Sequence, residues 1–243
     1  MRFEAILVAH GSPGDPAPQE AVMQALAVRV AMWLPGWRLR GATLAMPGAL
    51  EAAVAALRAP LVYPFFMAEG WFTRTNLPRR LAAAQAAKDG VPQLAACEPG
   101  LRQLAPFGTD PGLADLIAAT LVEAAPKGPI LIAAHGSKVS TTSSATTYEM
   151  VKTLQARGFG PLQAGFVEEA PFLADVARKM GAAGGGGLCL PFFALRAGHV
   201  VQDIPEALAE AEFEGQLLPP IGEDIGVARL IAAALARAVG QSL

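Results

Sequence analysis

Short apolar runs alternate with segments of helical periodicity along the first half of the chain. The apolar runs, which predict strands, are 3–9, 37–45, 61–66 and 91–97. The segments that predict helices are 15–33, 48–58, 78–88 and 112–124.

The same alternation starts again after residues 126–128. Strands are predicted at 129–134, 162–167, 188–193 and 217–218. Helices are predicted at about 145–157, 171–180, 205–213 and 226–239, and a Ser/Thr-rich loop precedes the first of them. Alternation of this kind indicates an α/β fold in which right-handed crossovers connect parallel strands.

Three short motifs recur in the same order in both halves. They are His-Gly-Ser at 10–12 and 135–137, Pro-Phe-Phe at 64–66 and 191–193, and a proline at 78 and 205. The offset is 125 for the first motif (135 − 10) and 127 for the other two (191 − 64 and 205 − 78), so coincidence is a poor explanation. We therefore predict two copies of one unit, residues 1–126 and 127–243, with a ligand cleft between them at the carboxyl ends of the strands.

The chain contains three histidines, and all three lie at or just beyond a predicted strand end. In open α/β sheets that edge is where ligands bind. A single histidine there would most often do no more than hydrogen-bond a loop. Because His10, His135 and His199 share this location, we interpret them as functional side chains.

Two adjacent glutamates follow the second strand of the second half. An acidic helix N-terminus is one interpretation of Glu168 and Glu169, because the helix dipole favours carboxylates there. The other is a carboxylate beside His135 that acts as a base or a metal ligand. Strand alternation places the two side chains on opposite faces, so one is expected in the cleft, and the sequence does not say which. Asp203 opens a helix and is expected to cap it rather than to bind a ligand.

Convergence of His135, a glutamate and His199 from three successive strand ends predicts a site for a borderline divalent ion. Imidazole nitrogen together with carboxylate oxygen suits Co²⁺, Ni²⁺, Fe²⁺ or Zn²⁺. The pattern does not separate a permanent metal site from one through which an ion passes.

The first half has lost most of this set. When the prolines that follow the second strands are aligned, Leu44 and Ala45 occupy the positions of the two glutamates. When the Pro-Phe-Phe motifs are aligned, Phe72 occupies that of the third histidine. Trp71 and Phe72 are either ordinary core aromatics or a surface for a flat macrocycle.

Composition narrows the class of protein. Apolar residues make up 53% of the 243 and charged residues 16%, which is typical of a globular chain. The net charge of −2 argues against a nucleic-acid partner. No apolar run predicts a membrane span and no signal peptide precedes the first strand, so we expect a cytoplasmic protein. Cys97 and Cys189 lie in apolar runs without a Cys-x-x-Cys pattern, which predicts buried thiols and no iron–sulfur cluster.

The motifs of the second half together resemble those of one enzyme family. After the His-Gly-Ser strand end come 166–168 (Phe-Val-Glu), the Pro-Phe-Phe motif, 198–200 (Gly-His-Val) and 203–205 (Asp-Ile-Pro). This combination resembles the class II chelatases of cobalamin and sirohaem synthesis, the CbiX/CbiK sirohydrochlorin chelatases. Through the internal repeat the resemblance covers nearly the whole chain, and it is strong in the second half.

The resemblance implies two flavodoxin-like halves with a tetrapyrrole bound between them. It implies that His135 and His199 bind the incoming metal ion and accept pyrrole protons, assisted by Glu168 or Glu169, with His10 as the remaining site residue of the first half. The side chains expected to contact the ring or its acidic substituents are Ser137, Lys138, Trp71, Phe72, Arg74, Arg79, Arg196 and the loop 140–147. For the cations among them, a solvated surface is the alternative interpretation.

The resemblance also implies an enzyme, a sirohydrochlorin chelatase of the lyase class. We expect Co²⁺ as its first substrate metal and Fe²⁺ or Ni²⁺ next, and no organic cofactor. One chain should provide a complete cleft as a monomer, and further oligomerisation is compatible with this. We expect the second half to do the chemistry and the first half to act as a lid. The alternatives are a metal or tetrapyrrole carrier without turnover and, third, a small-ligand sensor.

Overall fold

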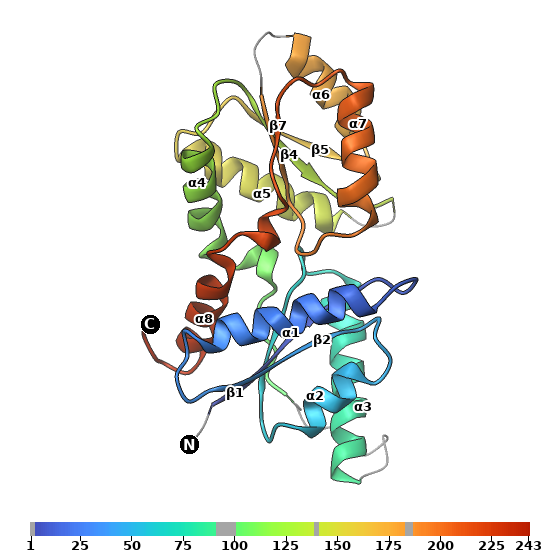
Figure 1. Ribbon diagram of the computed structural model, residues 1–243, viewed down its shortest axis with the longest axis vertical. Coiled ribbons are helices and arrows are strands. Elements are labelled where there is room, and N and C mark those ends of the chain that lie inside the picture. The colour runs from blue at the N-terminus through green and yellow to red at the C-terminus, as the bar shows by residue number, and fades with distance from the viewer. Residues whose placement is uncertain (1–2, 91–100, 139–140, 183–186) are drawn as a thin grey trace. The chain divides into compact units, whose positions relative to one another are not determined.

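The computed structural model describes residues 3–90, 101–138, 141–182 and 187–243. The chain forms two compact units. The first comprises Met1–Asp110 together with Gly226–Leu243, and the second comprises Pro111–Ile225. Each unit has a parallel sheet flanked by helices, which confirms the predicted α/β class (Figure 1).

The sheet of the first unit has three strands in the order β2-β1-β3. These are β1 (Glu4–Ala9), β2 (Arg38–Thr43) and β3 (Leu61–Pro64). The helices are α1 (Ala17–Ala31), α2 (Ala49–Ala55), α3 (Leu77–Asp89) and α8 (Val227–Ala238), with a π-helical turn η1 (Phe72–Asn76) before α3 and a 3-10 turn η3 (Phe107–Thr109). Ile6 and Val8 of the central strand share a core with Leu50 of α2 and Leu81 of α3. Burial of such apolar side chains on the sheet is the main force that stabilises the unit.

The sheet of the second unit has four strands in the order β5-β4-β6-β7. These are β4 (Ile130–Ala134), β5 (Leu162–Phe166), β6 (Leu188–Pro191) and β7 (Gln216–Leu217). The helices are α4 (Leu113–Ala124), α5 (Thr142–Ala156), α6 (Leu173–Ala182) and α7 (Ile204–Glu210), with a π-helical turn η4 (His199–Asp203) before α7 and a 3-10 turn η5 (Ile221–Glu223). Helices α6 and α7 lie side by side and share a core with β4 and β6 (Figure 1). The π-helical turns therefore occupy corresponding places in the two units.

The two units exchange the helix that ends each repeat. Helix α4 follows the first repeat in the chain but belongs to the second unit, and α8 belongs to the first. In the first unit Asp110 accepts hydrogen bonds from the hydroxyl of Tyr63 on β3 and from Arg237 on α8, both at 3.1 Å. In the second unit Asp224 accepts one from Thr120 on α4, at 2.8 Å. The predicted halves, 1–126 and 127–243, follow the sequence repeat. The compact units differ from these halves because each unit contains the last helix of the other repeat.

A fourth repeat motif, which the sequence analysis missed, carries these two aspartates. It reads Pro-Phe-Gly-Thr-Asp at 106–110 and Pro-Ile-Gly-Glu-Asp at 220–224. Its offset is 114 (220 − 106), against 127 for the preceding motif, so the first half is 13 residues longer between the two (127 − 114). Because its offset differs from that of the other motifs, a comparison of the two halves at one fixed offset does not detect this motif.

Most predicted elements are confirmed within a few residues, with one clear difference. Helix α5 begins at Thr142, so most of the Ser/Thr-rich segment predicted as a loop is the first part of a helix. Side-chain hydroxyls in its first turns donate hydrogen bonds to backbone carbonyls one turn earlier. The hydroxyl of Thr146, for example, donates to the carbonyl oxygen of Thr142 at 3.0 Å, so these side chains are compatible with the helix. The strand predicted at 91–97, and Cys97 with it, lies outside the described residues. Cys189 is buried in β6 as predicted, and burial raises the pKa of its thiol to about 12.

None of the helices in the ranges given above is long and apolar enough to cross a lipid bilayer.

Candidate active site

His135 directly follows β4, an interior strand of the second unit. The turn after it uses Gly136 at a φ of +72°, a backbone region that favours glycine. A Cβ atom added at Gly136 would also lie only 2.8 Å from Cγ of Glu169, so the site has no space for a side chain. This turn brings the Gly136 carbonyl oxygen to 2.7 Å from Nδ1 of His135. Because a carbonyl oxygen can only accept, Nδ1 carries the proton and Nε2 keeps its lone pair.

His199 opens the π-helical turn η4, just after strand β6, which pairs with β4. Its ring stands edge-on to that of His135, with ring centroids 4.4 Å apart and planes at 88°. Nδ1 of His199 is hydrogen-bonded to carboxylate Oδ2 of Asp203. In its neutral form the second imidazole therefore also has its lone pair on Nε2.

The predicted capping role of Asp203 is wrong. Its side chain makes no hydrogen bond to the start of α7. Since η4 runs directly into α7, the backbone is already helical before Asp203 and no new helix end is formed there. The carboxylate contacts His199 instead.

The two glutamates after β5 have different partners. Glu169 accepts a hydrogen bond from the backbone N–H of Ser137 at 3.0 Å, and so stabilises the turn after β4. Glu168 is ion-paired with Nζ of Lys138 at 2.9 Å. The hydrogen bond and the charge of Lys138 lower the pKa of Glu168, and the two imidazoles lower it further. Glu169 is thus bonded to the turn that follows His135, and Glu168 to the lysine at its end.

Glu168 and Asp203 also line one cavity of about 560 Å³ in the second unit. The other carboxylates around it are Asp175, Glu206 and Glu210. Clustered carboxylates create a negative potential that attracts cations. Within the described ranges, no three His, Cys, Asp or Glu side chains lie close enough together to hold a metal ion.

The first unit repeats this geometry with a phenylalanine in place of the second histidine. Nδ1 of His10 donates to the carbonyl oxygen of Gly11 at 2.7 Å. Phe72 opens η1 and stands edge-on to His10, with ring centroids 4.3 Å apart and planes at 89°. These contacts agree with the predicted equivalence of Phe72 and His199. The first unit accordingly has one imidazole where the second has two.

The strand register corrects the predicted match for the glutamates. The N–H of Ala45 donates to the carbonyl of the histidine after β1 at 2.8 Å, and the N–H of Glu168 makes the same bond after β4 at 2.9 Å. Ala45, not Leu44, therefore stands at the position of Glu168, and Met46 at that of Glu169. The alignment on prolines was off by one because the second half has one more residue between its strand and its proline.

The aromatic pair of the first unit lies at the surface. Trp71 is 57% exposed and Phe72 is 38% exposed, which favours a contact surface over core packing. Their rings contact each other with centroids 5.1 Å apart.

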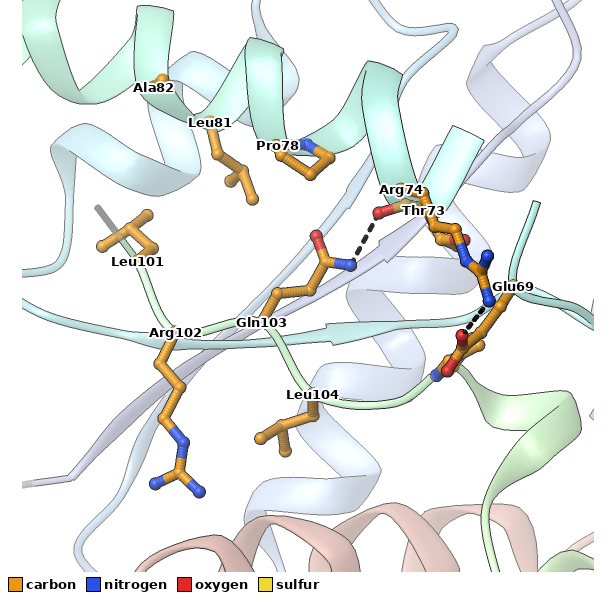
Figure 2. Close-up of a pocket in the computed structure, with 11 residues that line it drawn as sticks. Glu69, Thr73, Arg74, Pro78, Leu81, Ala82, Leu101, Arg102, Gln103 and Leu104 are labelled. Carbon is orange, nitrogen blue, oxygen red and sulfur yellow. Dashed lines mark hydrogen bonds and ion pairs between the residues drawn. The ribbon is translucent and has the colours of Figure 1, made fainter. Parts of the chain in front are cut away.

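A cavity that the sequence did not indicate lies within the first unit, beside η1 and α3 (Figure 2). Its volume is about 600 Å³. Apolar side chains such as Leu81 and Leu101 line one part, and Gln103 donates from Nε2 to the backbone carbonyl of Thr73 in η1 at 2.8 Å. Arg74, also on η1, is ion-paired with Glu69 at the edge of this cavity (Figure 2).

Three of the cations predicted to bind the ring have acidic partners in their own unit. The pairs are Arg74–Glu69 at 2.8 Å, Lys138–Glu168 at 2.9 Å and Arg196–Glu223 at 2.7 Å. The hydrogen bonds that Arg196 donates to Glu223 raise the pKa of its guanidinium. All three cations are about half exposed or more, and exposed pairs of this kind contribute little to stability. Arg79 lies exposed on α3.

Comparison with known proteins agrees with this geometry. A model of the CbiX family matches residues 129–239. The chain is 44% identical to the solved structure of CbiX, the terminal enzyme for biosynthesis of siroheme in denitrifying bacteria, over 98% of this chain and 99% of that chain, with a TM-score of 0.82. A search of curated proteins gave no match.

Two further structures share the fold at low identity. SirB from Bacillus subtilis with Fe³⁺ is 14% identical over 99% of this chain and 98% of its own, with a TM-score of 0.75. The sirohydrochlorin chelatase SirB from Bacillus subtilis subspecies spizizenii, in complex with cobalt, is 15% identical over 97% and 94%, with a TM-score of 0.68. The extent and identity of the match to CbiX show that this chain belongs to the CbiX family of class II chelatases, the metal-inserting enzymes of tetrapyrrole synthesis.

Proposed function

We propose that this protein inserts a divalent metal ion into sirohydrochlorin. The observation that carries the proposal is the histidine pair, whose rings lie 4.4 Å apart and whose Nδ1 atoms both have acceptors. Two Nε2 lone pairs are then available to one ion. Neutral imidazole near pH 7 is both a ligand for borderline metals and a proton acceptor.

The reaction requires proton acceptors as well as ligands. Four metal–nitrogen bonds form as the ion enters the ring, two N–H bonds break, and two protons leave. His135 and His199 guide the ion and take up these protons, and Glu168 is the carboxylate next in reach. The acidic cavity beside Glu168 and Asp203 would raise the local concentration of divalent cations.

The ring needs contacts beyond the metal site. Its carboxylates would displace the glutamates from Lys138, Arg74 and Arg196, and the exposed rings of Trp71 and Phe72 offer an apolar surface for the macrocycle. Ser137, at the turn after β4, remains a proposed ring contact. In this proposal the second repeat carries the chemistry and the first repeat contributes mainly to holding the ring.

We propose Fe²⁺ as the substrate metal, with Co²⁺ second. The residues alone favoured neither ion strongly, and Co²⁺ was the first expectation. The relative that is 44% identical is a terminal enzyme of siroheme synthesis, and sirohaem contains iron, which reverses the order.

The test is a direct chelation assay. Purified protein is mixed under anaerobic conditions with sirohydrochlorin and, in separate reactions, Fe²⁺, Co²⁺ or Ni²⁺, and the absorbance change is compared with the uncatalysed rate. We expect acceleration with Fe²⁺ and Co²⁺ and a higher kcat/KM for Fe²⁺. Ring binding without acceleration by any ion would instead support a tetrapyrrole carrier.

A further inference from the structure

The proposed function uses Asp203 only as one of the carboxylates that line the acidic cavity. Its carboxylate Oδ2 accepts the Nδ1 hydrogen of His199, four residues earlier in the same π-helical turn. Both side chains are partly buried, with 34% of His199 and 39% of Asp203 exposed. The contact is therefore local, since both residues are carried by one turn of backbone.

The other two histidines of the chain show why His199 needs such a partner. In each of them Nδ1 donates at 2.7 Å to the carbonyl of the following glycine, which has a positive φ. His199 is instead followed by Val200 in a helical turn, and its Nδ1 is bonded to a side chain. A side-chain acceptor on the same turn serves the purpose instead.

The first unit provides an internal comparison. Its π-helical turn η1 has the same length and also leads into a helix with proline near its start. Phe72, which has no ring N–H, stands at the position of His199, and Asn76 stands at that of Asp203, at the same offset of 127 (203 − 76). The aspartate thus occurs in the turn that has the histidine, and amide replaces carboxylate in the turn without it.

We propose that Asp203 is a positioning residue that holds His199 in the tautomer with the proton on Nδ1. This fixes the ring edge-on to His135 and leaves Nε2 of both imidazoles with lone pairs for one metal ion. Histidine in water favours the other tautomer, with the proton on Nε2, and that form cannot bind a metal through Nε2. Acceptors behind metal-binding histidines set tautomer and ring orientation in this way in many sites.

The inference rests on the proposed function for its effect on turnover, but the tautomer can be measured without turnover. Full-length protein labelled with ¹⁵N in histidine gives long-range ¹H–¹⁵N correlations that distinguish Nδ1–H from Nε2–H, and three histidines make the spectrum assignable. The variants are Asp203→Ala, Asp203→Glu and the matched control Asn76→Ala. Thermal melts establish that each variant is folded.

We expect His199 to carry its proton on Nδ1 in the wild type and in Asn76→Ala, and to shift toward Nε2–H in Asp203→Ala. In the same variant Co²⁺ alone should bind about 10- to 100-fold more weakly, and kcat for metal insertion should fall by a similar factor with little change in KM for the ring. Asp203→Glu should recover part of both losses, and Asn76→Ala should leave both unchanged.

Two outcomes would overturn the proposal. One is an unchanged His199 tautomer in folded Asp203→Ala with weaker Co²⁺ binding, which would make Asp203 a direct ligand. The other is unchanged Co²⁺ affinity despite a shifted tautomer. A wild-type protein that binds Co²⁺ but inserts no metal would refute the proposed function, while the tautomer and Co²⁺ measurements would still decide the role of Asp203.

Discussion

The ring of Phe72 stands edge-on to that of His10, with centroids 4.3 Å apart and planes at 89°. The rings of His199 and His135 make the same contact in the second unit, at 4.4 Å and 88°. The two repeats therefore share one scaffold for a pair of rings and differ in whether the second ring can bind a metal. This difference sets the expectations for mutation.

His135→Ala should lower the rate of metal insertion by at least about 100-fold, because it removes a ligand and a proton acceptor together. His10→Ala should lower kcat/KM by about tenfold at most, the size of a modest loss of ring affinity. The two variants are compared in one steady-state assay with folding checked by circular dichroism. A larger loss in His10→Ala than in His135→Ala would reverse the roles assigned to the two repeats.

The double substitution Phe72→His and Asn76→Asp should create a second metal-binding pair in the first unit. The ring geometry at His10 already matches that of the native pair, and the aspartate supplies the acceptor for the new imidazole. Titration with Co²⁺ should show one additional bound ion per chain. Phe72→His alone should bind that ion more weakly, and equal stoichiometry in wild type and double variant would refute the shared-scaffold argument.

Gly136→Ala should destabilise the fold by at least about 1 kcal/mol, because an L side chain is strained at a φ of +72°. It should also displace Glu169, whose Cγ would lie 2.8 Å from the new Cβ. Urea denaturation measures the effect. Gly181→Ala, in helix α6 with open space around it, is the control and should leave stability equal or slightly higher. Equal midpoints for the two variants would contradict the strain argument.

Asp110→Ala should cost about 2 kcal/mol of folding free energy, because it leaves the buried hydroxyl of Tyr63 without this acceptor and removes the link from β3 to α8. Asp115→Ala, which removes an exposed surface pair with Arg157, is the control and should change stability by less than about 0.5 kcal/mol. A loss no greater than that of the control would show that the Asp110 contacts do not hold the exchanged helix in place.

Lys138→Met should raise the pKa of Glu168 toward its ordinary value of 4.5, since the hydrogen bond and charge of Lys138 are the main causes of the depression. A depressed carboxylate pKa stabilises the folded state above the unfolded pKa, and this contribution disappears as the pH falls through the folded pKa. The variant should therefore lose less stability than the wild type on acidification. Carboxyl ¹³C NMR titration measures the pKa directly, and an unchanged Glu168 pKa would exclude the ion pair as its cause.

The internal repeat and the histidines at the strand ends could be predicted from the sequence because both depend on local sequence patterns. Strand and helix follow from the spacing of apolar residues, and His135 and His199 stand out because both follow strand ends. The motif around Asp203 was also visible, but its carboxylate was misinterpreted as a cap. Aspartate is common both as a helix cap and as a hydrogen-bond partner of histidine, so the residue type does not distinguish the two roles. The continuous helical backbone from η4 into α7 does distinguish them, because it leaves no helix start for Asp203 to cap.

By itself, the sequence determined the α/β class, the internal repeat, the histidine pair and the loss of its counterpart in the first half. Only the tertiary structure decided which partner each glutamate has, which acid each cation pairs with, and to which unit each terminal helix belongs. Glu168 and Glu169 differ by one residue along the chain, and their roles diverge because the turn after β4 brings Ser137 to one and Lys138 to the other. Helix α8 belongs to the first unit and α4 to the second, where they are bonded to Asp110 and Asp224, residues more than 100 positions away in the chain. Contacts between residues distant in the sequence leave no periodic signal in it, and folding alone brings them together.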